Sequence, residues 1–153
     1  MKGRLLVGPL LLLLGLALLA QTVRWQNRMT ASRVLRSVET VTMAAVRARR
    51  ADPLPANIDL LRRAAERDPL EVGIPIARGS QHLLLGQSQA AIDAYEEALR
   101  LEPRPEVYLN LGRAYDLAGR SEDAAHAFAL ALRIDPRLLP QVPPAYRATE
   151  ETR

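Results

Sequence analysis

The chain has 153 residues, contains no cysteine and carries a formal net charge of +4. The length allows one domain with a modest core, and the lack of cysteine excludes disulfide bonds and thiol chemistry. Residues 1–50 hold nine Lys or Arg and one acid, whereas residues 51–153 hold 12 Arg and 16 acids. Since the basic residues flank an apolar segment and the rest is acidic, the composition argues against nucleic-acid binding. Lys2 is the only lysine among 21 basic residues, a bias typical of bacterial coding.

Residues 1–25 are predicted to form a membrane anchor. The sixteen residues from Leu5 to Ala20 are strictly apolar, and the uncharged stretch continues through Gln21 and Thr22 to Val23. As a helix, Leu5 to Val23 measures about 28 Å, close to the thickness of a bilayer's hydrocarbon core. Trp25 comes next, at the depth expected for an interfacial aromatic side chain.

A cleaved secretory signal is the alternative for the same segment. The best cleavage site, after Ala20, places Leu18 where a small residue is preferred, which favours an uncleaved signal anchor. The short basic start favours export of the rest of the chain, although the basic residues after the segment balance it. We therefore expect a single-pass protein of the bacterial inner membrane with a periplasmic repeat domain, and keep a cytoplasmic domain as the alternative.

Residues 26–50 are predicted to form a basic helical stem that also supplies the first helix of a degenerate repeat. There is no Pro or Gly from Asn27 to Arg50, so the anchor is expected to continue into this stem as one helix. The stem's membrane-proximal side chains are expected to lie against anionic lipid headgroups, with a solvated helix face as the alternative. These residues are Arg24, Trp25, Arg28, Arg33 and Arg36.

An internal period of 33 to 34 residues organises the rest of the chain. An acid followed by proline closes three successive stretches, at Asp68-Pro69, Glu102-Pro103 and Asp135-Pro136. Such a period predicts stacked helical hairpins. It assigns residues 51–70 to the second helix of the degenerate repeat, and residues 71–104 and 105–137 to two further repeats.

The last copy has the pattern Tyr108-x2-Leu111-Gly112-x2-Tyr115, then Gly119, Ala124-x3-Phe128, Ala131 and Pro136. It resembles the tetratricopeptide repeat (TPR) at every anchor position. The preceding copy matches in part, at Gly79, Gly86, Ala91, Tyr95, Ala98 and Pro103. The resemblance implies an all-α protein, in which the transmembrane helix and stem lead into a short α-solenoid of two to three hairpins.

Helix geometry accounts for the last copy. Small Gly112 and Ala124 are expected to allow two helices to approach closely, and aromatic Tyr115 and Phe128 to fill the space between them. Gly119 suits a left-handed helix end, and Ser121 suits the N-cap of the next helix.

The sequence contains no recognisable catalytic residue, metal site or cofactor motif. His82 and His126 are 44 residues apart and have no cysteine or carboxylate pair beside them, which does not make a zinc site. The glycines form no phosphate-binding motif. The sequence predicts a protein that is not an enzyme and needs no cofactor.

The resemblance implies that the first helices of the repeats line a concave groove for a protein partner. The predicted groove residues are Leu83, Leu84, Glu106, Leu109, Asn110, Arg113, Asp116 and Leu117. Asn110 matches a position where related repeats carry an asparagine that bonds the ligand backbone, although a role in helix packing is equally open. The predicted function is a membrane-anchored TPR adaptor or scaffold, a subunit or assembly factor of a larger bacterial membrane complex. No small-molecule substrate is expected.

Two alternatives stay open. One is a cleaved, soluble periplasmic or secreted peptide-binding TPR module, and the other is a regulatory subunit of an enzyme whose active site lies on another chain. The proline-rich tail, residues 138–153, is expected to be partly disordered at its end. Leu138, Leu139 and Val142 either cover the exposed end of the last hairpin or dock onto a partner.

Overall fold

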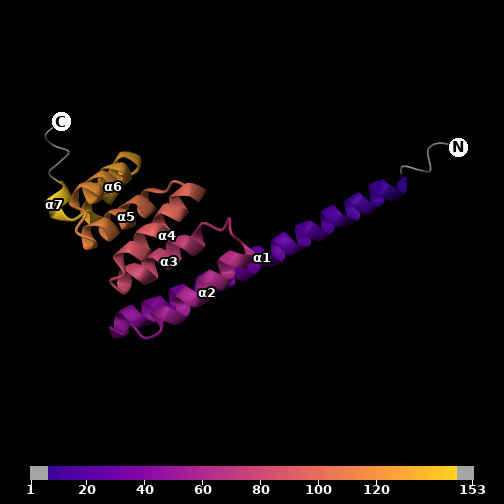
Figure 1. The fold of residues 1–153 in the computed structure, drawn as a ribbon, viewed down its shortest axis with the longest axis horizontal. Coiled ribbons are helices and arrows are strands. Elements are labelled where there is room, and N and C mark those ends of the chain that lie inside the picture. Colours follow the sequence, from indigo (N-terminus) through magenta and orange to yellow (C-terminus); the bar gives the residue numbers. More distant parts are fainter. Residues whose placement is uncertain (1–6, 148–153) are drawn as a thin grey trace.

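The computed structural model describes residues 7–147, which form a stack of antiparallel helices with one long helix projecting from it (Figure 1). Three hairpins succeed one another along the chain. They are α1 (Val7–Ala48) with α2 (Leu54–Arg67), α3 (Gly73–Leu84) with α4 (Ser88–Leu101), and α5 (Pro105–Leu117) with α6 (Ser121–Ile134). A 3-10 turn (Pro136–Gln141) and the short α7 (Pro144–Arg147) complete the described part, which contains no strand. The prediction of an all-helical TPR-like solenoid is confirmed, whereas the disorder predicted for the chain's end falls on residues 148–153, outside the described range.

The turns within the last two hairpins depend on glycine. Gly86 and Gly119 end α3 and α5 with φ of 71° and 73°, a left-handed conformation that glycine adopts without strain. The amide of Arg120 then donates to the carbonyl of Tyr115 at 2.9 Å, closing the α5–α6 turn. The N-cap predicted at Ser121 is wrong: α6 begins at that residue, and Arg120 precedes it without a side-chain capping bond.

Each of the last two hairpins is built around one aromatic ring packed over a glycine. Tyr95 of α4 lies over Gly79 of α3, and Phe128 of α6 lies over Gly112 of α5. Both rings are fully buried. Because glycine has no Cβ, the two helix backbones approach closely enough for the ring to fill the gap between them. The contact between this ring and this glycine therefore explains why both residue types recur at the repeat spacing.

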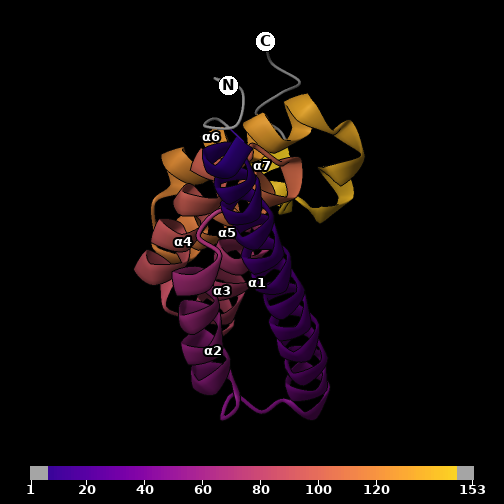
Figure 2. The same ribbon diagram turned by 90° about the vertical axis from the view of Figure 1, so that its right-hand side faces the viewer.

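The second half of α1 belongs to the stack. Figure 2 shows α1 and α2 running side by side from the loop that joins them. Their interface buries a cluster that extends to α3 and consists of Ala31, Val38, Leu61, Ala64 and Ile74. The first half of α1 projects beyond the stack, and its leucines from Leu10 to Leu19 are exposed (Figure 1).

The projecting half of α1 bears on the predicted anchor. Within residues 7–147, no helix is long and apolar enough to cross a membrane. The uncharged part of α1 ends at Val23, before Arg24 and Arg28, so from Val7 it measures about 25 Å against about 30 Å of hydrocarbon core. The transmembrane helix predicted within residues 1–25 is therefore not supported, and residues 1–6 of that segment lie outside the described range.

A buried polar trio joins the first three helices. Asn57 of α2 and Gln81 of α3 are buried, and the Asn57 Nδ2 group donates to Gln81 Oε1 at 3.2 Å. The Gln81 Nε2 group donates to Thr42 Oγ1 of α1 at 2.9 Å, and Thr42 Oγ1 donates to the carbonyl of Val38 at 2.7 Å. Since each polar group is satisfied, the trio fixes how α1, α2 and α3 sit against one another.

Replacing Asn57 by leucine is expected to lower the free energy of unfolding by about 1–3 kcal/mol, because buried Gln81 loses its donor. Urea denaturation followed by circular dichroism measures the change. The triple variant Thr42→Val, Asn57→Leu, Gln81→Leu should recover most of the loss, since it leaves no polar group of the trio unpaired. An Asn57→Leu protein as stable as the parent would contradict a stabilising role for the trio.

Candidate binding groove

The first helices of the hairpins lie next to one another: α1 contacts α3, and α3 contacts α5. In a stack of helical hairpins, this row of first helices forms one continuous surface that curves with the solenoid. The surface is the candidate binding groove. Its two ends differ in the residues that occupy them.

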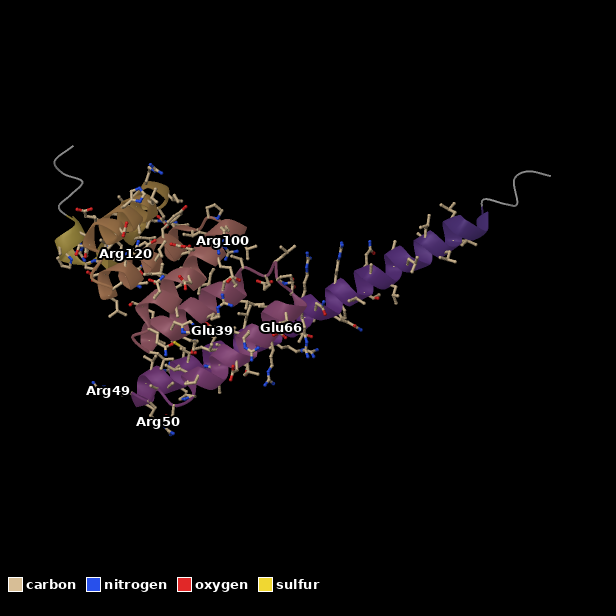
Figure 3. The ribbon with its side chains drawn as sticks, viewed as in Figure 1. Glu39, Arg49, Arg50, Glu66, Arg100 and Arg120 are labelled. Atoms are coloured by element: carbon tan, nitrogen blue, oxygen red, sulfur yellow. The ribbon has the colours of Figure 1, made fainter. Side chains whose placement is uncertain are left out.

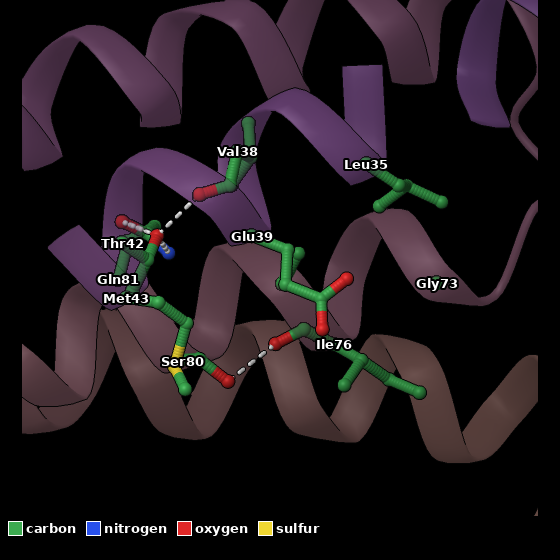
Figure 4. A pocket seen from close by; sticks show the side chains of 10 residues that line it. Leu35, Val38, Glu39, Thr42, Met43, Gly73, Ile76, Ser80 and Gln81 are labelled. Carbon is green, nitrogen blue, oxygen red and sulfur yellow. Dashed lines mark hydrogen bonds between the residues drawn. The ribbon is translucent and has the colours of Figure 1, made fainter. Parts of the chain in front are cut away.

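At the α1 end, the groove contains a pocket of about 340 Å³. Figure 4 shows Leu35, Glu39 and Met43 of α1 in a row opposite Ile76 and Ser80 of α3. The α1 residues are four apart, so they occupy successive turns of one helix face. Other lining residues are Val38, Thr42, Gly73, Ala77 and Gln81.

Glu39 is the single ionisable residue in the pocket lining. Its side chain is exposed and forms no ion pair with the rest of residues 7–147. The neighbouring Ser80 hydroxyl is already engaged, donating to the Ile76 carbonyl at 3.0 Å and lying 3.2 Å from the Tyr95 hydroxyl. The pocket therefore offers an apolar floor with one free carboxylate, which suits an apolar side chain beside a cation.

At the α5 end, the chain's own carboxyl-terminal segment covers the groove. Leu109, predicted as a groove residue, is buried against Leu138 and Val142. A second predicted groove residue, Arg113, donates from Nη2 to the carbonyl of Gln141 at 3.2 Å. Asp116, a third predicted groove residue, accepts a hydrogen bond from the Tyr146 hydroxyl at 2.5 Å. The carboxyl-terminal segment therefore contacts three of the predicted groove residues.

The remaining predicted groove residues are divided. The Asn110 Oδ1 atom accepts a hydrogen bond from Arg113 Nη1 at 2.9 Å, a contact within α5. Leu84, Glu106 and Leu117 are exposed, whereas Leu83 packs against the core cluster beneath α3. The exposed Leu84 and Leu117 do not belong to the pocket lining.

The polar contacts behind the groove are structural. The Tyr115 hydroxyl donates to Glu96 Oε1 at 2.9 Å, and Arg120 lies 4.5 Å from the centre of the Tyr115 ring. Burial and then the hydrogen bond to Glu96 raise the pKa of Tyr115 to about 12, so its phenol stays protonated at physiological pH. It tethers α5 to α4 and is unsuited to proton transfer.

The two histidines give no metal-ligand arrangement. The His82 Nδ1 atom lies 2.7 Å from Gln87 Oε1, a hydrogen bond across the α3–α4 turn. Within the described range, no group of three or more His, Asp or Glu side chains is placed to hold a metal ion.

The α1 wall of the pocket at the α1 end was missed in the sequence. Leu35, Glu39 and Met43 of this pocket lie in the segment interpreted as a basic stem, which was expected to contact lipid headgroups rather than line the groove. One signal was available: Glu39 is the single acid in the first 50 residues and stands between Leu35 and Met43 at helical spacing. The predicted stem residues Arg24, Trp25, Arg28, Arg33 and Arg36 are all exposed.

Comparison with known proteins agrees with the hairpin geometry. One tetratricopeptide repeat model matches residues 105–138, and a second matches residues 77–105. The chain carries tetratricopeptide repeats. The TPR match covers α5, α6 and most of the preceding hairpin, the part in which glycine and aromatic residues alternate in register.

A solved structure described as "MamA MSR-1 C2" has the same TPR-like arrangement of helices. It superposes with a TM-score of 0.55 at 20% sequence identity, covering 78% of this chain and 71% of that chain. At this identity the likeness concerns the fold. Among curated proteins, the search found no match.

Proposed function

We propose that this protein is a non-catalytic adaptor that binds a protein partner along the groove formed by α1, α3 and α5. Its TPR repeats suggest a protein-interaction adaptor or scaffold. The observation that carries the finer proposal is the pocket between α1 and α3, which lies in the part of the groove that the chain's own tail leaves open. The α5 end is already filled by Leu138 and Val142.

The pocket's chemistry indicates the kind of segment it binds. Leu35, Met43 and Ile76 favour a buried aliphatic or aromatic side chain, and Met43 can adapt its shape to it. Glu39 favours a Lys or Arg next to that apolar anchor. The partner segment is therefore apolar with a neighbouring positive charge, and we propose that it belongs to a subunit of a bacterial membrane complex that this protein helps to assemble.

The adaptor role is tested by capture of partners from membranes of the native host with the tagged full-length protein, followed by mass spectrometry. Glu39→Arg is expected to lower partner recovery and affinity by about tenfold or more, because it opposes a cation with a cation at a partly enclosed site. Glu122→Arg on α6 is the matched control, since Glu122 is exposed and lies outside the groove.

The outcomes separate the site from the role. Equal recovery with Glu39→Arg and the parent protein would contradict binding at the α1–α3 pocket. Failure of the parent protein to recover any partner, with all membrane complexes intact after deletion of the protein, would contradict the adaptor role itself.

The location is a separate part of the proposal. We propose that the apolar end of α1, together with residues 1–6, attaches the protein to the bacterial inner membrane with the TPR repeats in the periplasm. The exposed leucines from Leu10 to Leu19 and the exposed Trp25 support attachment to an apolar phase. Intact mass of the membrane-extracted protein tests it, because a mass beginning near Gln21 would indicate a cleaved, soluble module instead.

A further inference from the structure

A second cavity lies where α1 leaves the stack. The Asn27 Nδ2 group of α1 donates to the carbonyl of Arg67 at 2.8 Å, joining the long helix to the end of α2. The cavity beside this contact has a volume of about 370 Å³. Its lining consists of Arg24, Asn27, Arg28, Arg67, Asp68, Pro69 and Leu70.

The cavity concentrates unpaired positive charge. Arg24 and Arg28 stand one turn apart on α1, and Arg67 reaches the same cavity from the end of α2. All three are exposed, and none forms an ion pair within residues 7–147. Asp68 is the one acid in the lining, so the cavity retains an excess of two positive charges. Guanidinium groups present several donors in a planar fork that matches phosphate oxygens.

The surroundings of the cavity are apolar on the side of the projecting helix. The exposed leucines of α1 end at Leu19, and exposed Val23 follows about one turn later, next to Arg24. Trp25 and Leu70, 62% and 77% exposed, stand beside the arginines. Solvent-facing apolar residues next to a cationic cavity fit a molecule that carries a phosphate and a hydrocarbon chain together, better than a fully hydrated anion.

We propose that this cavity binds the phosphate of an anionic phospholipid headgroup, with the lipid's acyl chains along the exposed leucines of α1. The inference rests on the proposed attachment to a membrane and adds to it a defined headgroup site. It also gives the junction of α1 and α2 a role: Arg67, which is distant from the predicted stem in sequence, joins Arg24 and Arg28 at one headgroup. Bound lipid would then hold the TPR stack close to the bilayer surface.

The test uses the purified full-length protein and flotation with vesicles of phosphatidylcholine alone or of phosphatidylcholine mixed with phosphatidylglycerol. The parent protein is expected to bind both and to prefer the anionic vesicles. Arg24→Gln, Arg28→Gln, Arg67→Gln combined should lower binding to the anionic vesicles by about tenfold or more, because each cation close to an anionic surface contributes about fivefold. Binding to pure phosphatidylcholine should be unchanged.

A matched control removes three arginines elsewhere: Arg47→Gln, Arg50→Gln, Arg133→Gln. Arg50 lies at the end of α1 opposite to the projecting half (Figure 3), and all three control residues are exposed. This control has the same net charge as the cavity variant, so it should keep the preference for anionic vesicles.

Four results would overturn the headgroup site. An equal loss in both triple variants would mean that net charge alone acts, and no preference for anionic vesicles would mean that the cavity binds no anionic lipid. Calorimetric binding of inorganic phosphate without vesicles, abolished by the cavity variant, would reassign the cavity to a free anion. Failure to bind either kind of vesicle would contradict the membrane attachment on which the site rests, while leaving the partner-binding groove unaffected.

Discussion

Replacing Gly112 by alanine is expected to destabilise the protein by about 1–3 kcal/mol, although alanine normally stabilises a helix by about 1 kcal/mol relative to glycine. A Cβ atom on Gly112 would lie 2.6 Å from Cε1 and 2.7 Å from Cδ1 of Phe128. The Phe128 ring is 1% exposed, and the ring of Tyr146 packs against it with the two centres 5.0 Å apart. Because the ring has little room to move, the clash outweighs the gain in helix propensity.

Urea denaturation followed by circular dichroism measures the effect of Gly112→Ala. The double variant Gly112→Ala, Phe128→Leu should lose less stability than the sum of the losses of the two single variants, since a smaller side chain makes room for the new methyl group. Gly15→Ala is the matched control, because nothing lies within 4 Å of a Cβ atom built there. If the Gly112→Ala protein unfolds at the same urea concentration as the parent, α5 and α6 can move apart to admit the methyl group, and their close approach is not required for stability.

The pairing of glycine with an aromatic ring was visible in the sequence because it is set by spacing along the chain. Gly112 and Phe128 occupy fixed positions within one hairpin, and a hairpin with a short turn has few ways to bring two such positions together. The same holds for Gly119, whose left-handed conformation is a local property of the turn. Fold class and the packing of the last hairpin can therefore be predicted from short-range pattern.

The polar trio and the α1–α3 pocket depend on contacts between distant segments. Thr42 and Gln81 are 39 residues apart in the chain, and the Asn57 side chain reaches both from a third helix. Their sequence neighbours give no periodic signal, because a hydrophilic side chain on a helix is normally solvated. The first hairpin also departs most from the repeat pattern, so its register against α3 had to come from the structure.

That the chain's own tail covers the α5 end of the predicted groove could not be read from the sequence, for a related reason. Repeat register gives the direction in which Leu109, Arg113 and Asp116 point, but it does not determine where the chain runs after the last repeat. The sequence left open whether Leu138, Leu139 and Val142 covered the hairpin or met a partner. In the structure, Leu138 and Val142 are buried against the last hairpin. The tail thus occupies the position that a further repeat would take. The part of the groove that stays uncovered lies at the α1 end.

The largest loss of stability is expected from Val142→Asp. Val142 is fully buried among Leu109, Phe128 and Leu138, where a carboxylate would have no water, and the nearby Arg147 guanidinium is already engaged by the Val142 and Pro140 carbonyls. An uncompensated buried charge costs about 3–5 kcal/mol, so the change should detach the tail and expose the end of the last hairpin. Thermal denaturation and limited proteolysis of residues 136–147 measure the loss.

Leu139→Asp separates burial from a general effect of charge in the tail. Leu139 lies in the same 3-10 turn but is 46% exposed, so its replacement should change the free energy of unfolding by no more than about 0.5 kcal/mol. If both aspartates have equally small effects, the tail does not cap the stack, and the α5 end of the groove is open to a partner after all. If Val142→Asp alone destabilises the protein, the carboxyl-terminal segment completes the core and covers the α5 end of the groove, and the α1–α3 pocket is the part left open.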